Sequence, residues 1–214
     1  MHGQASPGQV LCYNEAVVWD FIAKQEFASA LEMLIQQYQD AIVRYCRCHI
    51  AEADKAQEIA QDVFLAVLEA MPRFRGQSSL KTWLYGIAVK KCLEAGRNGS
   101  RREHIARDNW RLIKQGAHCD PPQGPEEVWH QVHERQLVWQ ALHALRAQDR
   151  ELVVLRYLEE LTYDEIAQVL QLSKRTIERR LPVAQAKFHK AYERCQNKAM
   201  LSRHNLHGNG STRP

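Results

Sequence analysis

The chain has 214 residues, of which 45% are hydrophobic and 25% are charged, and its formal net charge is +4. This composition is typical of a soluble globular protein with one or two small domains, and it excludes a mainly disordered chain. No apolar run approaches the roughly 18–20 residues that are needed to cross a bilayer. The N-terminal segment lacks a basic stretch followed by an apolar one, so we expect a cytoplasmic protein without a signal peptide.

Helical periodicity dominates the N-terminal part of the chain. Apolar residues recur there at three- and four-residue steps in three segments, which predicts three amphipathic helices. Their apolar positions are Phe27, Leu31, Leu34, Ile35, Tyr38, Ile42 and Tyr45; then Ala56, Ile59, Ala60, Val63, Phe64, Val67, Leu68 and Met71, stopped by Pro72; then Leu80, Trp83, Leu84, Ile87 and Ala88, between about Ser79 and Leu93. Convincing alternating strands are absent. We therefore expect an all-α fold in which residues 25–97 form a three- or four-helix bundle after an N-terminal extension, residues 1–24.

The composition changes after Gly96. Glycines, prolines and charges follow with little periodicity, which predicts a flexible linker over residues 98–126. A second helical unit follows over residues 127–192. Its apolar positions are Val128, Val132, Leu137, Val138, Ala141, Leu142 and Leu145 in one helix, and a short apolar run from Leu152 to Leu158. Residues 193–214 are polar, and we expect them to fray.

The stretch TYDEIAQVLQLSKRTIERRL, Thr162 to Leu181, contains two helix starts. Thr162 and Glu165 have the spacing of a capping box, and Ser173 can cap a second helix after a short turn. The buried faces of the two helices are expected to be Ile166, Ala167 and Leu170, and then Ile177 and Leu181. This pattern predicts a helix-turn-helix, whose second helix can enter a major groove of DNA.

Two residues depart from an idealised helix-turn-helix. Gln171 occupies the turn position where glycine is commonest, and a left-handed conformation there would cost roughly 1–2 kcal/mol. Pro182 removes an amide donor from the second helix. We expect Pro182 to kink this helix, so that its groove-reading part ends near Leu181.

The outward face of the second helix is basic. Between positions 174 and 190 there are six basic residues and one acidic residue, which give a local net charge of +5 when His189 is neutral. The basic residues are Lys174, Arg175, Arg179, Arg180, Lys187 and Lys190, and the acidic residue is Glu178. Such residues contact DNA phosphates, and Arg and Glu can also read guanine and cytosine edges. A solvated basic helix without a ligand is the alternative, and the double cap favours DNA binding.

The segment from Glu58 to Arg97 resembles region 2 of bacterial sigma factors, and most closely the extracytoplasmic-function (ECF) group, which keeps only regions 2 and 4. The matching motif comprises Glu58, Gln61 and Phe64, followed by Thr82-Trp83-Leu84-Tyr85-Gly86-Ile87-Ala88. The C-terminal unit resembles region 4, with its motif at Leu161 to Ala167. The resemblance covers roughly residues 25–97 and 127–192.

The resemblance implies a role in transcription initiation. Region 2 of the family binds the β′ clamp helices of core RNA polymerase and captures the melted −10 element, and region 4 reads the −35 element and contacts the β flap. It assigns core binding to Glu58, Gln61 and Asp62, and −35 binding to Lys174, Arg175, Thr176, Glu178, Arg179 and Arg180. It assigns −10 binding to Arg73, Phe74, Arg75, Gln77, Ser78, Ser79, Lys81, Trp83, Tyr85, Lys90, Lys91 and Arg97. An anti-sigma factor is the expected inhibitor.

Several of these residues have simpler interpretations. Trp83 and Phe64 are expected in the core more readily than as base platforms, whereas Tyr85 is open to both. The sequence also departs from the family where Lys90 and Glu94 replace an asparagine and an aspartate, and where Asn98 replaces the second of a basic pair. Two other classes remain: a helix-turn-helix regulator that binds operators as a dimer without polymerase, and a helical adaptor that binds no DNA.

The cysteines and histidines do not predict a metal site. Cys46 and Cys48 would point about 200° apart on a helix and could hardly share one metal unless the helix breaks. His118, Cys119, His130 and His133 form a looser set. The six cysteines, which also include Cys12, Cys92 and Cys195, follow no framework spacing, so we expect free thiols. We expect no cofactor and no enzyme activity, because no phosphate-binding loop, nucleophile elbow, HExxH motif or carboxylate dyad occurs.

Overall fold

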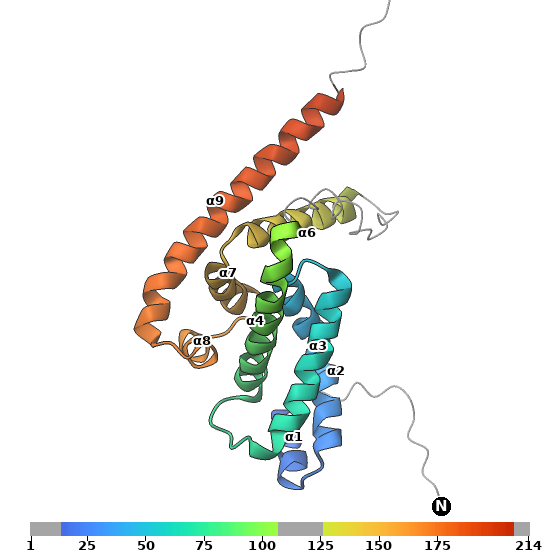
Figure 1. Ribbon diagram of the computed structural model, residues 1–214, viewed down its shortest axis with the longest axis vertical. Helices are drawn as coiled ribbons and strands as arrows, with labels where there is room; N and C mark the ends of the chain where they lie inside the picture. Colours follow the sequence, from blue (N-terminus) through green and yellow to red (C-terminus); the bar gives the residue numbers. More distant parts are fainter. Residues whose placement is uncertain (1–13, 107–125, 208–214) are drawn as a thin grey trace, which may run out of the picture.

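The computed structural model describes residues 14–106 and 126–207, and side chains within 14–96 and 134–200. The helices are α1 (Glu15–Ala23), α2 (Phe27–His49), α3 (Ala53–Ala70), α4 (Leu80–Ala106), α6 (Glu126–Ala144), α7 (Ala147–Val153), α8 (Tyr163–Leu170) and α9 (Lys174–His207), with a 3₁₀ turn over Met71–Arg73 and a π-helical turn over Val154–Leu158 (Figure 1). No strand occurs in these ranges, which confirms the predicted all-α fold. None of the described helices is both long and apolar enough to cross a membrane.

Helices α1 to α4 form the N-terminal unit. Helix α2 packs against α1 and α3, and α3 packs against α4. The predicted apolar stripes lie in the resulting core, with Leu34, Val63 and Leu84 fully buried. Helix α3 gives way to a 3₁₀ turn at Pro72, as the sequence predicts. The periodicity of the sequence therefore located these helices well.

Helix α1 lies within the expected N-terminal extension and has no predicted counterpart. The Asn14 side chain caps it by accepting a hydrogen bond from the Ala16 amide, at 3.0 Å. Glu15 accepts a hydrogen bond from the Leu80 amide, at 2.9 Å, and so satisfies a free donor at the beginning of α4. The Trp19 ring stacks on Phe74, with ring centroids 5.1 Å apart. The extension is therefore part of the bundle and supports the loop before α4.

Helix α4 continues to Ala106, so residues 98–106 of the expected linker are helical. This segment contains arginine, glutamate and alanine, which are good helix formers, and a glycine in a helix costs only about 1 kcal/mol. Gly96 lies within α4, where an added Cβ would meet no neighbouring atom within 4 Å outside the helix's own backbone. The rest of the expected linker, residues 107–125, lies outside the described residues.

Helices α6 to α9 form the C-terminal unit, in which α9 packs along α6, α7 and α8. The capping box is present: Thr162 Oγ1 accepts from the Glu165 amide at 3.3 Å, and the Glu165 carboxylate accepts from the Thr162 amide at 2.8 Å. Ser173 Oγ accepts from the Thr176 amide at 3.2 Å. Helices α8 and α9 therefore form the predicted helix-turn-helix.

Helix α9 differs from the prediction beyond Leu181. It contains Pro182 and continues to His207, so the described part of residues 193–214 is helical rather than frayed. The expected end of the groove-reading part near Leu181 stays a prediction. Leu181 and Ala184 are buried on either side of Pro182, because α9 packs on α6 and α7 there. Tertiary packing thus compensates for the missing amide donor, and the following alanine, arginine, glutamine and lysine residues favour the helix.

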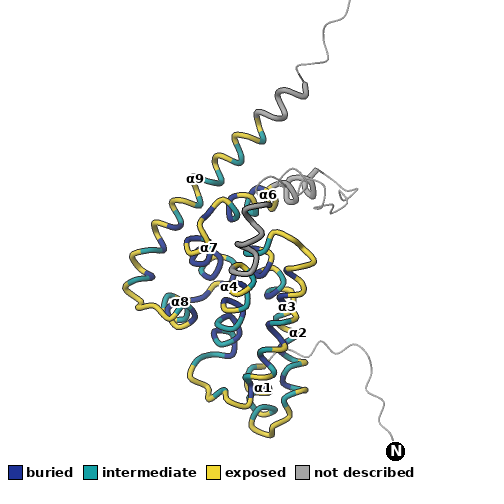
Figure 2. The backbone as a smooth tube through the Cα atoms, viewed as in Figure 1, coloured by how far each residue is buried: buried dark blue, intermediate teal, exposed yellow. Residues whose placement is uncertain are grey.

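The two units share one hydrophobic core. Helix α8 packs on α4, and α6 and α7 contact α2. Figure 1 shows α4 in the middle of the molecule, with α1 to α3 on one side and α7 to α9 on the other. Figure 2 shows buried residues, in dark blue, along α4, α7 and α8. The sequence did not predict this packing.

Candidate nucleic-acid interface

The first turns of α9 present the predicted basic face to solvent. Arg175, Glu178 and Arg179 are exposed and help to line an open groove of about 510 Å³. Lys174 forms an ion pair with Asp164 of α8 at 2.8 Å, which ties the two helices of the motif together. The Arg175 and Arg179 side chains have no partner among the described residues. This leaves two cations on a rigid helix free to contact an anionic ligand.

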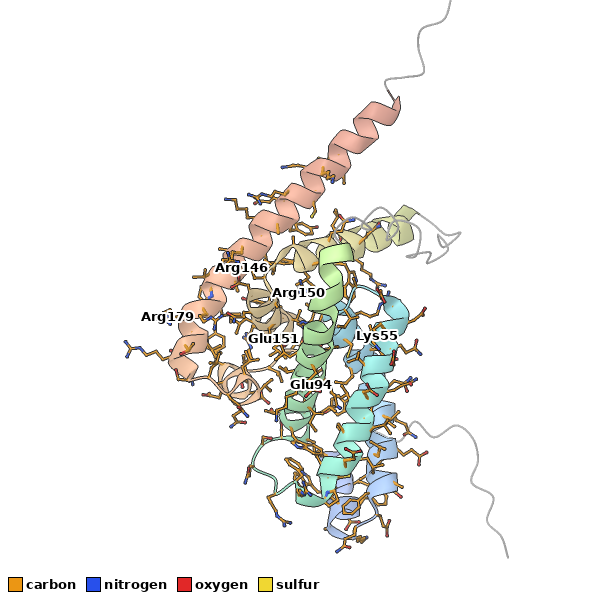
Figure 3. The ribbon with its side chains drawn as sticks, viewed as in Figure 1. Lys55, Glu94, Arg146, Arg150, Glu151 and Arg179 are labelled. Atoms are coloured by element: carbon orange, nitrogen blue, oxygen red, sulfur yellow. The ribbon has the colours of Figure 1, made fainter. Side chains whose placement is uncertain are left out.

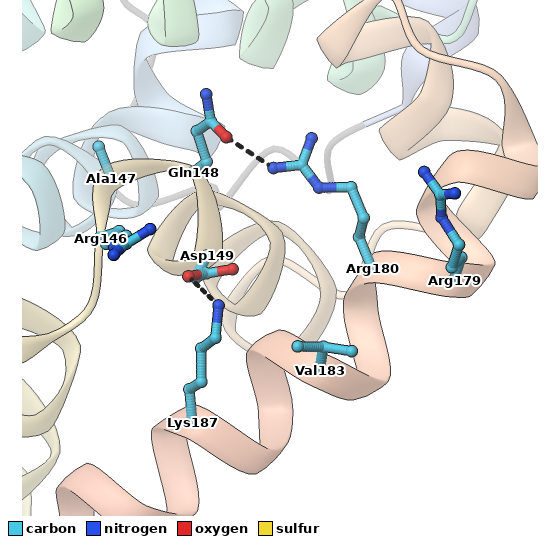
Figure 4. Close-up of a pocket in the computed structure, with 8 residues that line it drawn as sticks. All are labelled: Arg146, Ala147, Gln148, Asp149, Arg179, Arg180, Val183 and Lys187. Atoms are coloured by element: carbon cyan, nitrogen blue, oxygen red, sulfur yellow. Dashed lines mark hydrogen bonds and ion pairs between the residues drawn. The ribbon is translucent and has the colours of Figure 1, made fainter.

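A second, larger groove of about 720 Å³ lies between α9 and the beginning of α7 (Figure 4). Arg180 donates to Gln148 at 2.7 Å, and Lys187 forms an ion pair with Asp149 at 2.8 Å. Arg146 and Arg179 also line this groove. Because Arg179 lines both grooves, the basic surface continues from the start of α9 to the start of α7. Sequence reasoning missed Arg146, which is remote in sequence from the basic run and follows no periodic pattern.

The predicted −10 loop lies between the 3₁₀ turn and α4. Arg73, Arg75 and Gln77 are exposed, and Ser78 and Ser79 are half-buried. The Phe74 ring lies parallel to Trp83, with ring centroids 4.2 Å apart and an interplanar angle of 13°. The loop therefore carries basic and polar side chains beside an aromatic stack, in which Trp83 is half-buried.

A tight turn at Gly76 holds this loop close to α1. Gly76 has a φ of +69°, and a side chain there would lie 3.1 Å from the Trp19 ring. Both the left-handed backbone and the close ring favour glycine at this position.

The predicted −10 residues on α4 fall into two groups. Lys90 is exposed and Lys91 is half-buried, whereas the Arg97 side chain lies outside the described residues. Lys81 and Tyr85 instead face the C-terminal unit: Lys81 donates to the Glu159 carbonyl at 2.6 Å, and the fully buried Tyr85 hydroxyl donates to the Glu159 carboxylate. The structure therefore leaves the loop accessible and covers the adjacent face of α4.

The predicted polymerase-binding residues share the outward face of α3. Glu58 and Gln61 are exposed and Asp62 is half-buried. Glu58 pairs at 2.7 Å with Lys55, which is labelled on α3 in Figure 3. Leu65 follows Gln61 by four residues and is 59% exposed. Residues four apart lie on one helix face, so Leu65 adds an exposed apolar side chain to this face, which sequence reasoning missed.

Several charged or polar side chains are buried between the units. Burial raises the pKa of Glu151 to about 7, although a hydrogen bond from Tyr45 and the charge of Arg150 oppose this rise. Burial, Arg150 and His143 lower the pKa of His49 to about 3. Glu159 is only 3% exposed. These groups lie at the contact between α2, α4 and the C-terminal unit.

The described cysteines are free thiols, as predicted; they are Cys46, Cys48, Cys92 and Cys195. The Sγ atoms of Cys46 and Cys92 are 3.7 Å apart in the core, and burial raises the pKa of Cys48 to about 12. Among the described residues, no group of three His, Cys, Asp or Glu side chains could hold a metal ion. Cys12, His118, Cys119 and the side chains of His130 and His133 lie outside these residues.

Comparisons with known proteins agree with this geometry. Residues 34–102 match sigma-70 region 2 and residues 135–181 match sigma-70 region 4. The RNA polymerase sigma factor YlaC of Bacillus subtilis is 30% identical over 141 residues, which cover 66% of this chain and 79% of that protein. The ECF RNA polymerase sigma-E factor of Escherichia coli is 28% identical over 158 residues, which cover 71% of this chain and 81% of that protein. The solved structure of CnrH in complex with the cytosolic domain of CnrY shares the fold, with a TM-score of 0.56 and 20% identity. The match covers 84% of this chain and 96% of that chain.

A helix bundle followed by a basic helix-turn-helix is typical of DNA-binding proteins of the transcription machinery. The family matches and these relatives make the class specific: the chain belongs to the ECF group of the sigma-70 family of RNA polymerase sigma factors. Helices α1 to α4 accordingly contain region 2, and α6 to α9 contain region 4.

Proposed function

We propose that the chain joins core RNA polymerase and directs transcription initiation from promoters with −10 and −35 elements. The observation that carries this proposal is the exposed basic face of α9. Its Arg175 and Arg179 side chains have no partner among the described residues. A capped helix with free guanidinium groups suits a major groove, where arginine binds guanine in a bidentate manner.

The −35 contacts are assigned to Lys174, Arg175, Thr176, Glu178, Arg179 and Arg180. Arg146 and Lys187 extend the same basic surface toward the DNA backbone. The position of Glu178 between two arginines suits a cytosine amino group beside guanines. We therefore expect Arg175, Glu178 and Arg179 to set the base preference, and the other residues to position the duplex through phosphates.

The −10 contacts are assigned to the loop before α4 and to α4 itself. Arg73, Arg75, Gln77, Ser78 and Ser79 surround Phe74, and Lys81, Trp83, Tyr85, Lys90, Lys91 and Arg97 continue the surface along α4. Cations beside aromatic rings suit an unstacked single strand, since each stacked base contributes about 1–3 kcal/mol.

Core RNA polymerase is proposed to bind the outward face of α3 through Glu58, Gln61, Asp62 and Leu65, and region 4 is proposed to contact the β flap. An anti-sigma factor is the proposed inhibitor. The solved relative CnrH is described as a complex with the cytosolic domain of CnrY, which supports regulation by a partner protein. Because its polymerase partner is cytoplasmic, we place the activity there.

Run-off transcription with purified core polymerase, the full chain and a promoter library tests the proposal. We expect new start sites preceded by a shared −35/−10 pair. Arg179→Glu should abolish these transcripts, whereas Arg194→Glu, the same charge change at an exposed position farther along α9, should preserve them. Absence of core binding together with tight dimeric binding of duplex DNA would contradict the proposal and favour a polymerase-independent regulator.

A further inference from the structure

We propose that helix α1 positions the loop before α4, residues 74–79, and that its Trp19 side chain thereby sets the base preference at the −10 element. Helix α1 lies before the part of the chain that matches sigma-70 region 2, which begins at residue 34. The effect on base preference rests on the proposed function, because it requires this loop to bind the −10 strand. The positioning of the loop itself rests only on contacts within the N-terminal unit.

The loop before α4 has few backbone hydrogen bonds of its own. The Phe74 amide donates to the Met71 carbonyl at 3.1 Å, and the Trp83 amide donates to the Ser79 carbonyl at 3.0 Å. Between these two bonds, the amides of residues 75–79 donate to no backbone carbonyl among the described residues. The course of the loop is therefore fixed at its two ends and by side chains of other elements.

The exposed side chains of this loop also lack partners. Arg73, Arg75 and Gln77 are exposed, and none of them makes a hydrogen bond or an ion pair to another described residue. A side chain without a partner takes its position from the backbone that carries it. The position of the loop therefore decides where these three groups can meet a base or a phosphate.

Helix α1 contacts the loop through the Trp19 ring. Phe74 stacks on Trp83 with ring centroids 4.2 Å apart, and Trp19 stacks on Phe74 with ring centroids 5.1 Å apart and an interplanar angle of 20°. A Cβ added at Gly76 would lie 3.1 Å from Trp19 Cη2, so the loop backbone also passes close to this ring. Because stacking between aromatic rings is directional, Trp19 orients Phe74 in addition to covering it.

A hydrogen bond from α1 fixes the other end of the loop. Glu15 Oε1 accepts from the amide of Leu80, the first residue of α4, at 2.9 Å. Glu15 and Trp19 are four residues apart and therefore lie on one face of α1. This face contacts both ends of the loop, at Phe74 and at Leu80.

Helix α1 is itself anchored to the bundle. Val18 is fully buried, and α1 packs against α2. The turn between these two helices is tight, since the Glu26 amide donates to the Phe21 carbonyl at 2.9 Å and Gln25 has a left-handed φ of 62°. Figure 1 shows α1 at the same end of the bundle as the loop between α3 and α4. The loop is thus connected to α2 through α1.

Trp19 is therefore a positioning residue, which acts on DNA through Phe74 and the backbone of the loop. Removal of its ring leaves the basic and polar groups of the loop in the chain but lets the loop adopt several positions. Bases that fit the wild-type loop then lose their advantage over other bases. The affinity for core polymerase, which is proposed to bind α3, does not change.

Two matched pairs of variants test this role in the full chain. Trp19→Leu keeps an apolar side chain but removes the ring, and Trp19→Phe restores a ring that can stack. Glu15→Ala removes the acceptor for the Leu80 amide, and Glu15→Gln retains one. Val17→Ala, at an exposed position of α1, is the control. Far-UV circular dichroism verifies that each variant keeps its helices.

Hydrogen–deuterium exchange measures the anchoring of the loop without polymerase or DNA. We expect the Phe74 amide to exchange about three- to tenfold faster in Trp19→Leu, the size of one lost aromatic stack. The Leu80 amide should exchange about fivefold faster in Glu15→Ala, the size of one lost helix cap. Trp19→Phe, Glu15→Gln and Val17→Ala should stay close to the wild-type rates. Wild-type rates in Trp19→Leu and Glu15→Ala, or equally faster exchange throughout α9, would contradict the positioning of the loop by α1.

Run-off transcription from promoters with a randomised −10 element measures the effect on base preference. With Trp19→Leu we expect the polymerase to discriminate between preferred and other −10 bases about fivefold less than with the wild-type chain. The −35 preference and the affinity for core polymerase should not change, and Trp19→Phe should restore the discrimination. An unchanged −10 preference, or a uniform loss of transcripts over all −10 sequences, overturns the proposal.

The two measurements separate this inference from the proposed function. If the wild-type chain gives no promoter-specific transcripts, the proposed function fails, and the exchange rates alone decide whether α1 positions the loop. If the wild-type chain transcribes specifically and Trp19→Leu keeps its −10 preference, the proposed function stands and the role of Trp19 fails. Should Trp19→Leu lose its helices, the Glu15→Ala and Glu15→Gln pair provides both measurements.

Discussion

Three non-glycine residues within the described ranges adopt left-handed backbone conformations: Gln25, Glu160 and Gln171, with φ values of 62°, 56° and 53°. Each lies at the end of a helical segment and redirects the chain. At Gln171 the conformation lets the Leu172 amide donate to the Ala167 carbonyl at 2.9 Å, which closes α8 before α9 begins. The angle between α8 and α9 thus depends on Gln171, whose left-handed conformation costs conformational free energy in the folded chain.

Gln171→Gly should stabilise the protein. Glycine adopts the left-handed conformation without a Cβ clash, so we expect the free energy of unfolding to rise by about 0.5–1 kcal/mol after the larger entropy loss of glycine is included. Chemical denaturation measures this change. The matched control is Gln168→Gly, an exposed position inside α8, which should lower the free energy of unfolding by about 1 kcal/mol. Equal destabilisation by both variants would contradict the strain at Gln171.

At the scale of elements, the outward face of α3 combines charge with an exposed apolar side chain. Glu58 and Leu65 are 60% and 59% exposed and lie two helical turns apart on the same face. An exposed leucine on its own is unremarkable, but beside polar residues assigned to a partner it suits the centre of a protein interface.

Glu58→Arg and Leu65→Ser should each weaken binding to core polymerase. We expect a loss of roughly tenfold or more for each, because charge complementarity or apolar burial at the interface is removed. Pull-down titration with purified core polymerase measures the affinity. Glu32→Arg, on the exposed surface of α2, is the control and should bind normally. Normal binding by both α3 variants would place the polymerase contact elsewhere.

Helices that are stabilised by local interactions could be predicted from the sequence, whereas features that depend on long-range packing could not. Apolar periodicity and the caps at Thr162 and Ser173 are local signals, and they located α2, α3, α4, α8 and the start of α9. Helix α1 lacked a clear apolar stripe: Val18 is buried, Trp19 stacks on Phe74, and Glu15 accepts from the amide of Leu80. The continuation of α9 through Pro182 depends on packing against α6 and α7, which no local pattern records.

At the scale of the whole molecule, the packing of region 4 on region 2 lay beyond sequence reasoning. The residues that make it are far apart in the chain, and they include Glu151 and Glu159, which are buried although carboxylates usually lie on the surface. Sequence reasoning therefore assigned Lys81 and Tyr85 to DNA without detecting that the chain itself covers them. The exposed residues of the assigned site, on α9 and in the loop before α4, lie on elements that local signals located, and their contacts with DNA stay a prediction.

Two buried groups couple this packing to pH in opposite directions. Glu151 on α7 faces Tyr45 and His49 of α2, with Arg150 beside it, and its pKa is raised from 4.5 to about 7. The folded chain therefore binds more protons than the unfolded chain between these values, and stability falls as pH rises through this window. His49 has a pKa lowered from 6.5 to about 3, so the folded chain binds fewer protons there and stability falls as pH drops through that window.

The Glu151 and His49 effects oppose each other between pH 4.5 and pH 6.5, where both windows overlap. Glu151→Gln should remove the Glu151 effect and retain the His49 effect. The free energy of unfolding should then rise with pH, by an amount on the order of a few kcal/mol, up to about pH 6.5. His49→Gln should reverse the trend and give stability that falls toward pH 7. Urea denaturation of the full chain across this range measures both slopes. Parallel pH profiles for the three proteins would contradict the opposed titrations, whereas slopes of opposite sign would show that proton uptake and release both act at the contact between region 2 and region 4.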